Sequence, residues 1–157
     1  MELLKERIRQ TGVILSDQVI KLDTLITHQV DPQLMAACGR EFAKRFSGDS
    51  VTKVLTIESS GISPAFATAL ELGVPLVFAR RKKTLNTDKD AYCERVPSFT
   101  KGMVTDIIVS REFLGPGDRV LLIDDMIANG DAARGLIKII ARSGAELVGS
   151  GVLIEKA

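Results

Sequence analysis

The strand pattern at Val120–Ile123, with Asp124 and Asp125 directly after it, constrains the fold of this chain more than any other feature. The apolar run does not alternate with polar residues, which is typical of a strand buried on both faces in a parallel sheet covered by helices. The two carboxylates follow where such a strand is expected to reach solvent. Many open α/β sheets contain a strand of this kind, including the metal-holding strand of nucleotide hydrolases, so this pattern alone does not identify a function.

The loop after the two acids indicates what kind of ligand this strand could bind. Asn129-Gly130 is a turn dipeptide, and Gly130 allows a close approach between the backbone and a ligand. Asp131 is placed to cap the helix that follows, and the free N–H groups and dipole at a helix N-terminus favour phosphate. Acids that can bind hydroxyls or a metal, followed at once by a phosphate-binding loop, suit a sugar phosphate.

Composition excludes several other classes of protein. At 157 residues the chain fits one domain, residues 1–157, and its net charge of +1 argues against a nucleic-acid partner. The only histidine, His28, and the distant Cys38 and Cys93 offer no metal-binding spacing and no disulfide framework. The charged N-terminus shows no signal peptide and no apolar run approaches a membrane span, so we expect a cytoplasmic protein with no membrane partner.

A second strand–loop–helix unit comes earlier in the chain. Residues 53–57 predict a strand, Ser59-Ser60-Gly61 lies in the loop after it, and residues 63–72 predict a helix before the next strand at 74–79. Ligands bind at the carboxyl edge of open α/β sheets. The Ser59-Ser60-Gly61 loop is therefore expected to face the same edge as Asp124.

Four consecutive cations, Arg80-Arg81-Lys82-Lys83, stand at the end of that next strand. A solvated surface run and a polyanion-binding site are both open interpretations of this pattern. The polar segment from Thr84 to Met103 shows no periodic stripe, and a long irregular insertion in a compact domain is most often a lid or a binding loop. We therefore predict a lid here, followed by a strand at 104–110.

The remaining segments complete an α/β domain. Residues 2–11 predict a helix and residues 13–20 short extended pieces, which either form part of a cap over the site or pack on the edge of the domain. Asp31-Pro32 begins a helix with an apolar stripe that includes Cys38, expected in the core and not as a nucleophile. With a helix at 132–143 and a strand at 146–155, the order predicts one doubly wound domain with a mainly parallel sheet flanked by helices.

Taken together, these segments resemble the type I phosphoribosyltransferases, and among them the xanthine phosphoribosyltransferase family of purine salvage. The resemblance covers most of the chain. The supporting segments are 15–19, 28–32, 56–62, 123–125, 128–130 and 154–156. It implies the type I phosphoribosyltransferase fold, with a small N-terminal cap (the hood) and a flexible lid loop.

The resemblance also implies an activity. The enzyme would transfer 5-phosphoribose from phosphoribosyl diphosphate (PRPP) to xanthine, giving xanthosine 5′-monophosphate and diphosphate. It would be a homodimer and would use Mg²⁺ bound through the substrate diphosphate, with no metal held directly by the protein. In this family Asp124 and Asp125 would be the catalytic residues that bind the ribose hydroxyls.

The other site residues follow from the same resemblance. The 5-phosphate of PRPP would bind to Ala128, Asn129, Gly130, Asp131 and Ala132. The diphosphate would bind to Ser59, Ser60, Gly61 and Arg80. The purine would contact Ile20, Thr27 and Lys156, and the Lys156 ammonium, which only donates hydrogen bonds, favours oxopurines.

Two departures and three alternatives accompany this hypothesis. Thr27 stands where the family pattern has asparagine, and family members continue for some tens of residues beyond Lys156, so part of the C-terminal hood is expected to be missing. A hypoxanthine or guanine phosphoribosyltransferase is one alternative. A PRPP-sensing, non-catalytic regulator is a second, although the first 30 residues show no DNA-binding element. A nucleotide hydrolase would need a G-x-x-x-x-G-K-[ST] loop, which the sequence lacks.

Overall fold

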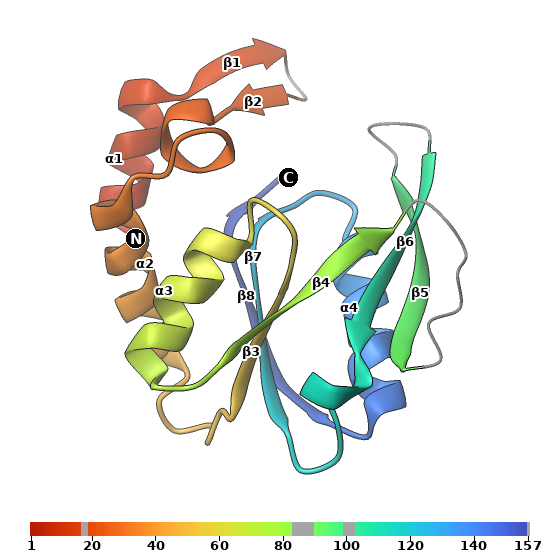
Figure 1. The fold of residues 1–157 in the computed structure, drawn as a ribbon. Helices are drawn as coiled ribbons and strands as arrows, with labels where there is room; N and C mark the ends of the chain where they lie inside the picture. Colours follow the sequence, from red (N-terminus) through yellow and green to blue (C-terminus); the bar gives the residue numbers. More distant parts are fainter. Residues whose placement is uncertain (17–18, 83–89, 99–102, 157) are drawn as a thin grey trace.

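A six-stranded sheet forms the centre of the protein (Figure 1). The structure, a computed structural model, describes residues 1–16, 19–82, 90–98 and 103–156. The strand order is β5-β6-β4-β3-β7-β8. The strands are β3 (Lys53–Ile57), β4 (Leu76–Lys82), β5 (Ala91–Ser98), β6 (Met103–Ser110), β7 (Arg119–Ile127) and β8 (Glu146–Glu155). The four strands β4, β3, β7 and β8 run parallel, whereas β6 and β5 add an antiparallel edge. The predicted α/β class with a mainly parallel sheet is confirmed.

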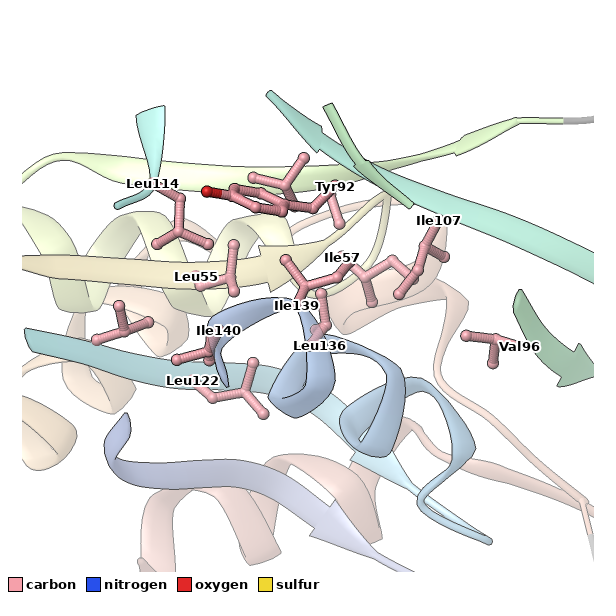
Figure 2. Close-up of a cluster of buried hydrophobic side chains, with 13 residues drawn as sticks. Leu55, Ile57, Tyr92, Val96, Ile107, Leu114, Leu122, Leu136, Ile139 and Ile140 are labelled. Carbon is pink, nitrogen blue, oxygen red and sulfur yellow. The ribbon is translucent and has the colours of Figure 1, made fainter. Parts of the chain in front are cut away.

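Helices cover both faces of this sheet. α2 (Pro32–Arg45) and α3 (Ile62–Leu72) lie on one face, and α4 (Asp131–Ser143) lies on the other. Figure 2 shows the core on the α4 side, where Leu136, Ile139 and Ile140 of the helix pack against side chains of β3 and β7. These three residues are the inward-facing positions that the 3.6-residue period of the sequence predicts.

The opposite face is filled by smaller side chains. Val54 of β3 and Leu121 of β7 pack against Ala65 and Ala69 of α3, with the phenyl rings of α2 half-buried beside them. The start of α2 is the one predicted, because the Asp31 carboxylate accepts a hydrogen bond from the Leu34 N–H at 3.0 Å. Small residues on α3 let that helix approach the sheet closely.

The N-terminal residues form a small unit beside α2. It consists of α1 (Glu2–Thr11), an antiparallel hairpin of β1 (Val13–Ser16) and β2 (Val19–Lys21), and a π-helical turn at Asp23–Thr27. Apolar side chains of α1 and the π-turn form a cluster with Leu34 and Cys38 of α2. Cys38 is therefore a core residue, as predicted, and burial raises the pKa of its thiol to about 11. Within the described ranges no helix is long and apolar enough to cross a bilayer.

Part of the predicted lid is wrong. Within the segment from Thr84 to Met103, residues Ala91–Ser98 form β5, which pairs with β6 along its whole length and buries Tyr92 and Val96. These two apolar anchors are too few to form a recognisable strand pattern, and the order comes from pairing with β6. The rest of the predicted lid before Met103, apart from Asp90, lies outside the described residues.

The basic run also lies in a strand and not after one. β4 continues to Lys82, and Arg80, Arg81 and Lys82 pair with Ile108, Ile107 and Asp106 of β6. The sequence pattern ended this strand at Ala79, because the cations interrupt its apolar run. Pairing with this antiparallel neighbour extends the strand beyond Ala79.

Candidate functional site

The candidate site lies at the topological switch point of the sheet. β3 and β7 are adjacent, yet the connection through α3 leads from β3 to β4 on one side, and the connection through α4 leads from β7 to β8 on the other. Loops diverge at such a point and leave a crevice beyond the carboxyl ends of the strands. The loop at 58–61 follows β3, and the loop at 128–130 follows β7.

A cavity of about 210 Å³ opens at this crevice. Its described lining includes Asp124 and the whole predicted phosphate loop, residues 128–132. Arg81 of β4 and Val96 and Pro97 of β5 complete one wall, and the segment around Gly151 of β8 contributes another part. The structure thus brings an acid and a helix start together in one hollow, which is what the sequence pattern required.

The turn before α4 differs in one detail from the prediction. Gly130, with φ of +75°, is the residue that caps the helix, and Asp131 is the first helical residue. No side chain caps this helix, so the N–H groups of its first turn keep their bonding capacity. The Arg134 Nη1 donates to the Asn129 carbonyl at 3.0 Å and the guanidinium pairs with the Asp131 carboxylate, which holds the loop in place.

The two acids lie inside β7, not beyond its end. β7 runs to Ile127 because β8 continues alongside it, with Asp124 opposite Val152 and Met126 opposite Ile154. Neighbouring strand residues point to opposite faces, and of the two acids only Asp124 lines the cavity. The Asp124 Oδ1 accepts a hydrogen bond from the Asp125 N–H at 3.0 Å.

The electrostatics of Asp124 are unusual. Burial, and secondly the neighbouring Asp125, raise the pKa of the Asp124 carboxyl to about 7, and the Arg81 charge opposes this shift. A carboxyl with such a pKa is only partly ionised at neutral pH and gains strongly from a partner that donates hydrogen bonds to its charged form. Ligand hydroxyls and cations are partners of that kind.

The loop after β3 touches Asp124 directly. Gly61 begins α3 as its N-cap residue, and a Cβ added there would lie 2.4 Å from Asp124 Oδ1 and 2.4 Å from Thr56 Oγ1. The φ of Gly61, −66°, is one that any residue can adopt. Glycine is needed here for space, because only glycine leaves room for both oxygens. Ser59 is exposed and Ser60 half-buried in the same loop, and the peptide bond between Glu58 and Ser59 is cis.

The cations of β4 are divided between two faces. Arg81 lines the cavity, donates its backbone N–H to Glu58 Oε1 at 2.7 Å and donates its Nε to the Glu58 carbonyl at 3.3 Å. Arg80, the cation selected from the sequence, is largely exposed and has its Nε 3.7 Å from Glu58 Oε2. Side chains alternate between the two faces along a strand, so Arg80 and Arg81 point to opposite faces of β4. The sequence pattern placed the cations after the strand, and this alternation could therefore not be predicted. The diphosphate role of Arg80 stays a prediction.

The three predicted purine contacts lie near the site without lining its cavity. Ile20 packs in the N-terminal cluster that also touches Met126. Thr27 is exposed and donates its hydroxyl to Asp23 Oδ1 at 2.9 Å. The Lys156 N–H donates to the Ile127 carbonyl at 2.9 Å, which places the end of β8 next to the phosphate loop. Their roles in base binding stay predictions.

Comparison with known proteins identifies the family. Residues 29–157 match the family of phosphoribosyl transferase domains. The chain belongs to the phosphoribosyltransferase family. It is 56% identical to the xanthine phosphoribosyltransferase of Moorella thermoacetica over 99% of this chain and 80% of that protein. It is 52% identical to the xanthine phosphoribosyltransferase of Stutzerimonas stutzeri over 100% of this chain and 83% of that one.

A solved structure extends the similarity to the fold. The crystal structure of adenine phosphoribosyltransferase from Rhodothermus marinus has a TM-score of 0.77 and 27% sequence identity, over 99% of this chain and 88% of the other. This phosphoribosyltransferase therefore has the type I fold that the motifs predicted. The adenine enzyme shares the architecture, whereas the identity to the two xanthine enzymes is about twice as high.

The acids of this phosphoribosyltransferase fit a metal carried by its substrate. Among the described residues, no group of three or more His, Cys, Asp or Glu side chains could hold a metal ion. Mg²⁺ keeps several waters and commonly binds through one or two carboxylates together with substrate phosphates. The described residues therefore fit a Mg²⁺ ion that substrate phosphates carry and that no set of protein ligands holds.

Proposed function

We propose that this enzyme transfers the 5-phosphoribosyl group of PRPP to xanthine, producing xanthosine 5′-monophosphate and diphosphate in purine salvage. The observation that carries the proposal is the cavity at the switch point, where Asp124 lies together with the start of α4, whose N–H groups no side chain caps. Relatives named xanthine phosphoribosyltransferase, two of them 56% and 52% identical, support xanthine as the base. The enzyme is proposed to act in the cytoplasm.

This reaction requires the protein to position the two substrates and to stabilise the charges that develop. The bond between ribose C1 and the diphosphate oxygen breaks with its electron pair on diphosphate, and positive charge builds on the sugar ring. A purine nitrogen forms the new bond to C1, and its proton is released to water. No side-chain nucleophile is needed. Asp124 and Asp125 would bind the ribose hydroxyls and stabilise the developing positive charge. The N–H groups of residues 128–132 would hold the 5-phosphate.

The diphosphate would leave on the β3 side of the crevice. The Ser59-Ser60-Gly61 loop offers backbone N–H groups and hydroxyls there, and Arg80 or Arg81 offers a cation, of which Arg81 already lines the cavity. Magnesium bound through the diphosphate would neutralise part of the charge on the leaving group. These groups act by binding the diphosphate before, during and after bond cleavage, and none of them transfers a proton.

The base would lie between the N-terminal unit and the end of β8. Ile20 offers an apolar contact and Lys156 an ammonium that donates to a purine carbonyl oxygen. Adenine has an amino group in place of such an oxygen, so Lys156 favours oxopurines. Hypoxanthine and guanine share the carbonyl and remain the alternative substrates.

A homodimer is part of the proposal. Val30, Phe66 and Leu70 are exposed apolar side chains that border a cavity of about 470 Å³ beside Ser59. A second copy of the chain packed here would remove this surface from water and support the diphosphate loop. Light scattering on purified protein should give twice the chain mass, and Phe66→Glu should lower it to the monomer value. A monomer for the unsubstituted protein would contradict this part.

One assay tests the activity. The protein is incubated with PRPP, Mg²⁺ and xanthine, hypoxanthine, guanine or adenine in separate reactions, and the nucleotide is identified by mass spectrometry. Xanthosine 5′-monophosphate is expected as the main product. Binding of PRPP without a nucleotide from any base would favour the non-catalytic, PRPP-sensing alternative instead.

A double variant tests the acids. Asp124→Asn with Asp125→Asn should lower turnover by orders of magnitude while the circular dichroism spectrum is unchanged. The matched control is Glu41→Gln, an acid of α2 paired with Arg45 and remote from the cavity. Near-normal turnover in the double variant would refute the mechanism.

A further inference from the structure

Thr56 carries a buried hydroxyl without a partner. Its side chain is completely buried, and its Oγ1 is the one side-chain atom of the described residues found buried without a hydrogen bond. Leaving a hydroxyl unpaired in the interior costs free energy that valine, of nearly the same shape, would not cost. Such a group points to a partner that comes within reach in another arrangement of the site.

The position of Thr56 indicates what that partner is. Thr56 lies on β3, next to β7, which carries Asp124. A Cβ on Gly61 would lie 2.4 Å from Thr56 Oγ1 and equally 2.4 Å from Asp124 Oδ1. Both oxygens therefore face the space that the missing side chain of Gly61 leaves open.

Two nearby uses of the hydroxyl are excluded by the geometry. Thr56 does not cap α3, because no side chain caps that helix. The other fully buried threonine, Thr68, lies in a helix, and its hydroxyl donates to the Pro64 carbonyl one turn earlier at 2.8 Å. Thr56 lies in a strand and makes no such bond. Asp124, in contrast, has capacity left, because a carboxylate accepts about four hydrogen bonds.

We infer that Thr56 is a positioning residue for Asp124: with PRPP bound, its hydroxyl donates a hydrogen bond to the Asp124 carboxylate across the gap at Gly61. This inference rests on the proposed function, in which Asp124 binds the ribose. The bond fixes one carboxylate oxygen and favours the charged form, so that the other oxygen is free for a ribose hydroxyl. The hydroxyl of Thr56 is then a donor placed for the PRPP-bound state.

Thr56→Val is the principal test. It keeps the shape and removes the hydroxyl, so the melting temperature of the ligand-free variant should be unchanged or higher. Its kcat/KM for PRPP should fall about tenfold, the scale of a hydrogen bond to a charged group. Thr56→Ser should restore most of the loss. Thr68→Val, which also removes a buried threonine hydroxyl, should leave kcat/KM unchanged.

A double-variant comparison separates positioning from a structural effect. When Asp124→Asn is already present, adding Thr56→Val should lower kcat/KM for PRPP by much less than tenfold, because Thr56 acts through the Asp124 charge. An equal loss in both backgrounds, or no loss in either, would overturn the inference. Failure of the unsubstituted enzyme to bind PRPP would instead refute the proposed function, so the two failures are distinguishable.

Discussion

The Cα of Gly61 lies against the carboxylate of Asp124, so the loop after β3 and the strand β7 meet at one point. An added Cβ would be 2.4 Å from Asp124 Oδ1 and 3.2 Å from the Ile57 carbonyl. Contacts this short force a shift of the carboxylate or of the loop. The proposed diphosphate loop and the proposed ribose acid are therefore positioned by the same contact.

Gly61→Ala should disable the site without unfolding the protein. We expect kcat/KM for PRPP to fall more than tenfold, because the carboxylate or the loop must shift by on the order of 1 Å, a misplacement large enough to slow catalysis. Steady-state kinetics against PRPP concentration measure this. Gly48→Ala is the control, since nothing lies within 4 Å of a Cβ there. If both variants kept normal kinetics, the contact at Gly61 would have no functional weight.

Asp124 should make the protein less stable as the pH rises. Its pKa is raised to about 7, by burial first and by Asp125 second, so between pH 4 and pH 7 the folded state binds more protons than the unfolded state. The free energy of unfolding should fall over that interval. Asp124→Asn removes this pH dependence. The free energy of unfolding of the variant, minus that of the unsubstituted protein, should therefore increase from pH 4 to pH 8. The increase is at most about 1.4 kcal/mol per unit of pKa shift.

Asp118 offers a control of opposite sign. Burial opposes ionisation there, but the Gly115 N–H and the Lys53 ammonium outweigh it and lower the pKa of Asp118. Its stabilising contribution is present at neutral pH and is lost as the pH falls below about 4. Asp118→Asn should therefore destabilise the protein at pH 8. Urea unfolding at pH 4, 6 and 8 measures both variants, and a pH-independent effect of Asp124→Asn would contradict the raised pKa.

Gly130→Ala should weaken phosphate binding through the backbone alone. The φ of +75° is unfavourable for alanine by about 1 kcal/mol, while an added Cβ meets nothing closer than 3.6 Å. We expect a loss of stability of that size and a several-fold weaker binding of PRPP in calorimetry. Gly73→Ala, at φ of +67° and far from the cavity, should lose similar stability and bind PRPP normally. Equal PRPP affinity in the two variants would show that the turn does not shape the site.

Arg134→Gln should loosen the phosphate loop. The variant loses the bond to the Asn129 carbonyl and the pairing with Asp131, so the loop no longer keeps its shape before PRPP binds. We expect KM for PRPP to rise several-fold with kcat nearly unchanged, because Arg134 lies at the phosphate end of the substrate. Lys138→Gln, an exposed cation further along α4, controls for the lost charge. A lower kcat at constant KM would assign Arg134 a different role.

Local signals in the sequence were enough for much of the architecture. The apolar run at 120–123, the cap at Asp31 and the inward stripe of α4 each depend on residues close in sequence, and each appears in the structure as predicted. The same holds for the two loops that meet at the site.

Other features depend on residues far apart in the sequence. β5 exists because β6 pairs with it, and the same neighbour extends β4 through Arg81. Gly130 and not Asp131 caps α4, and the proximity of Thr56, Gly61 and Asp124 comes from packing across β3 and β7. The sequence by itself determined which segments carry the chemistry, because turn, cap and burial signals are local. The tertiary structure decided which side chains reach the cavity and how ionisable they are, because pairing, alternation and desolvation are set by neighbours distant in the chain.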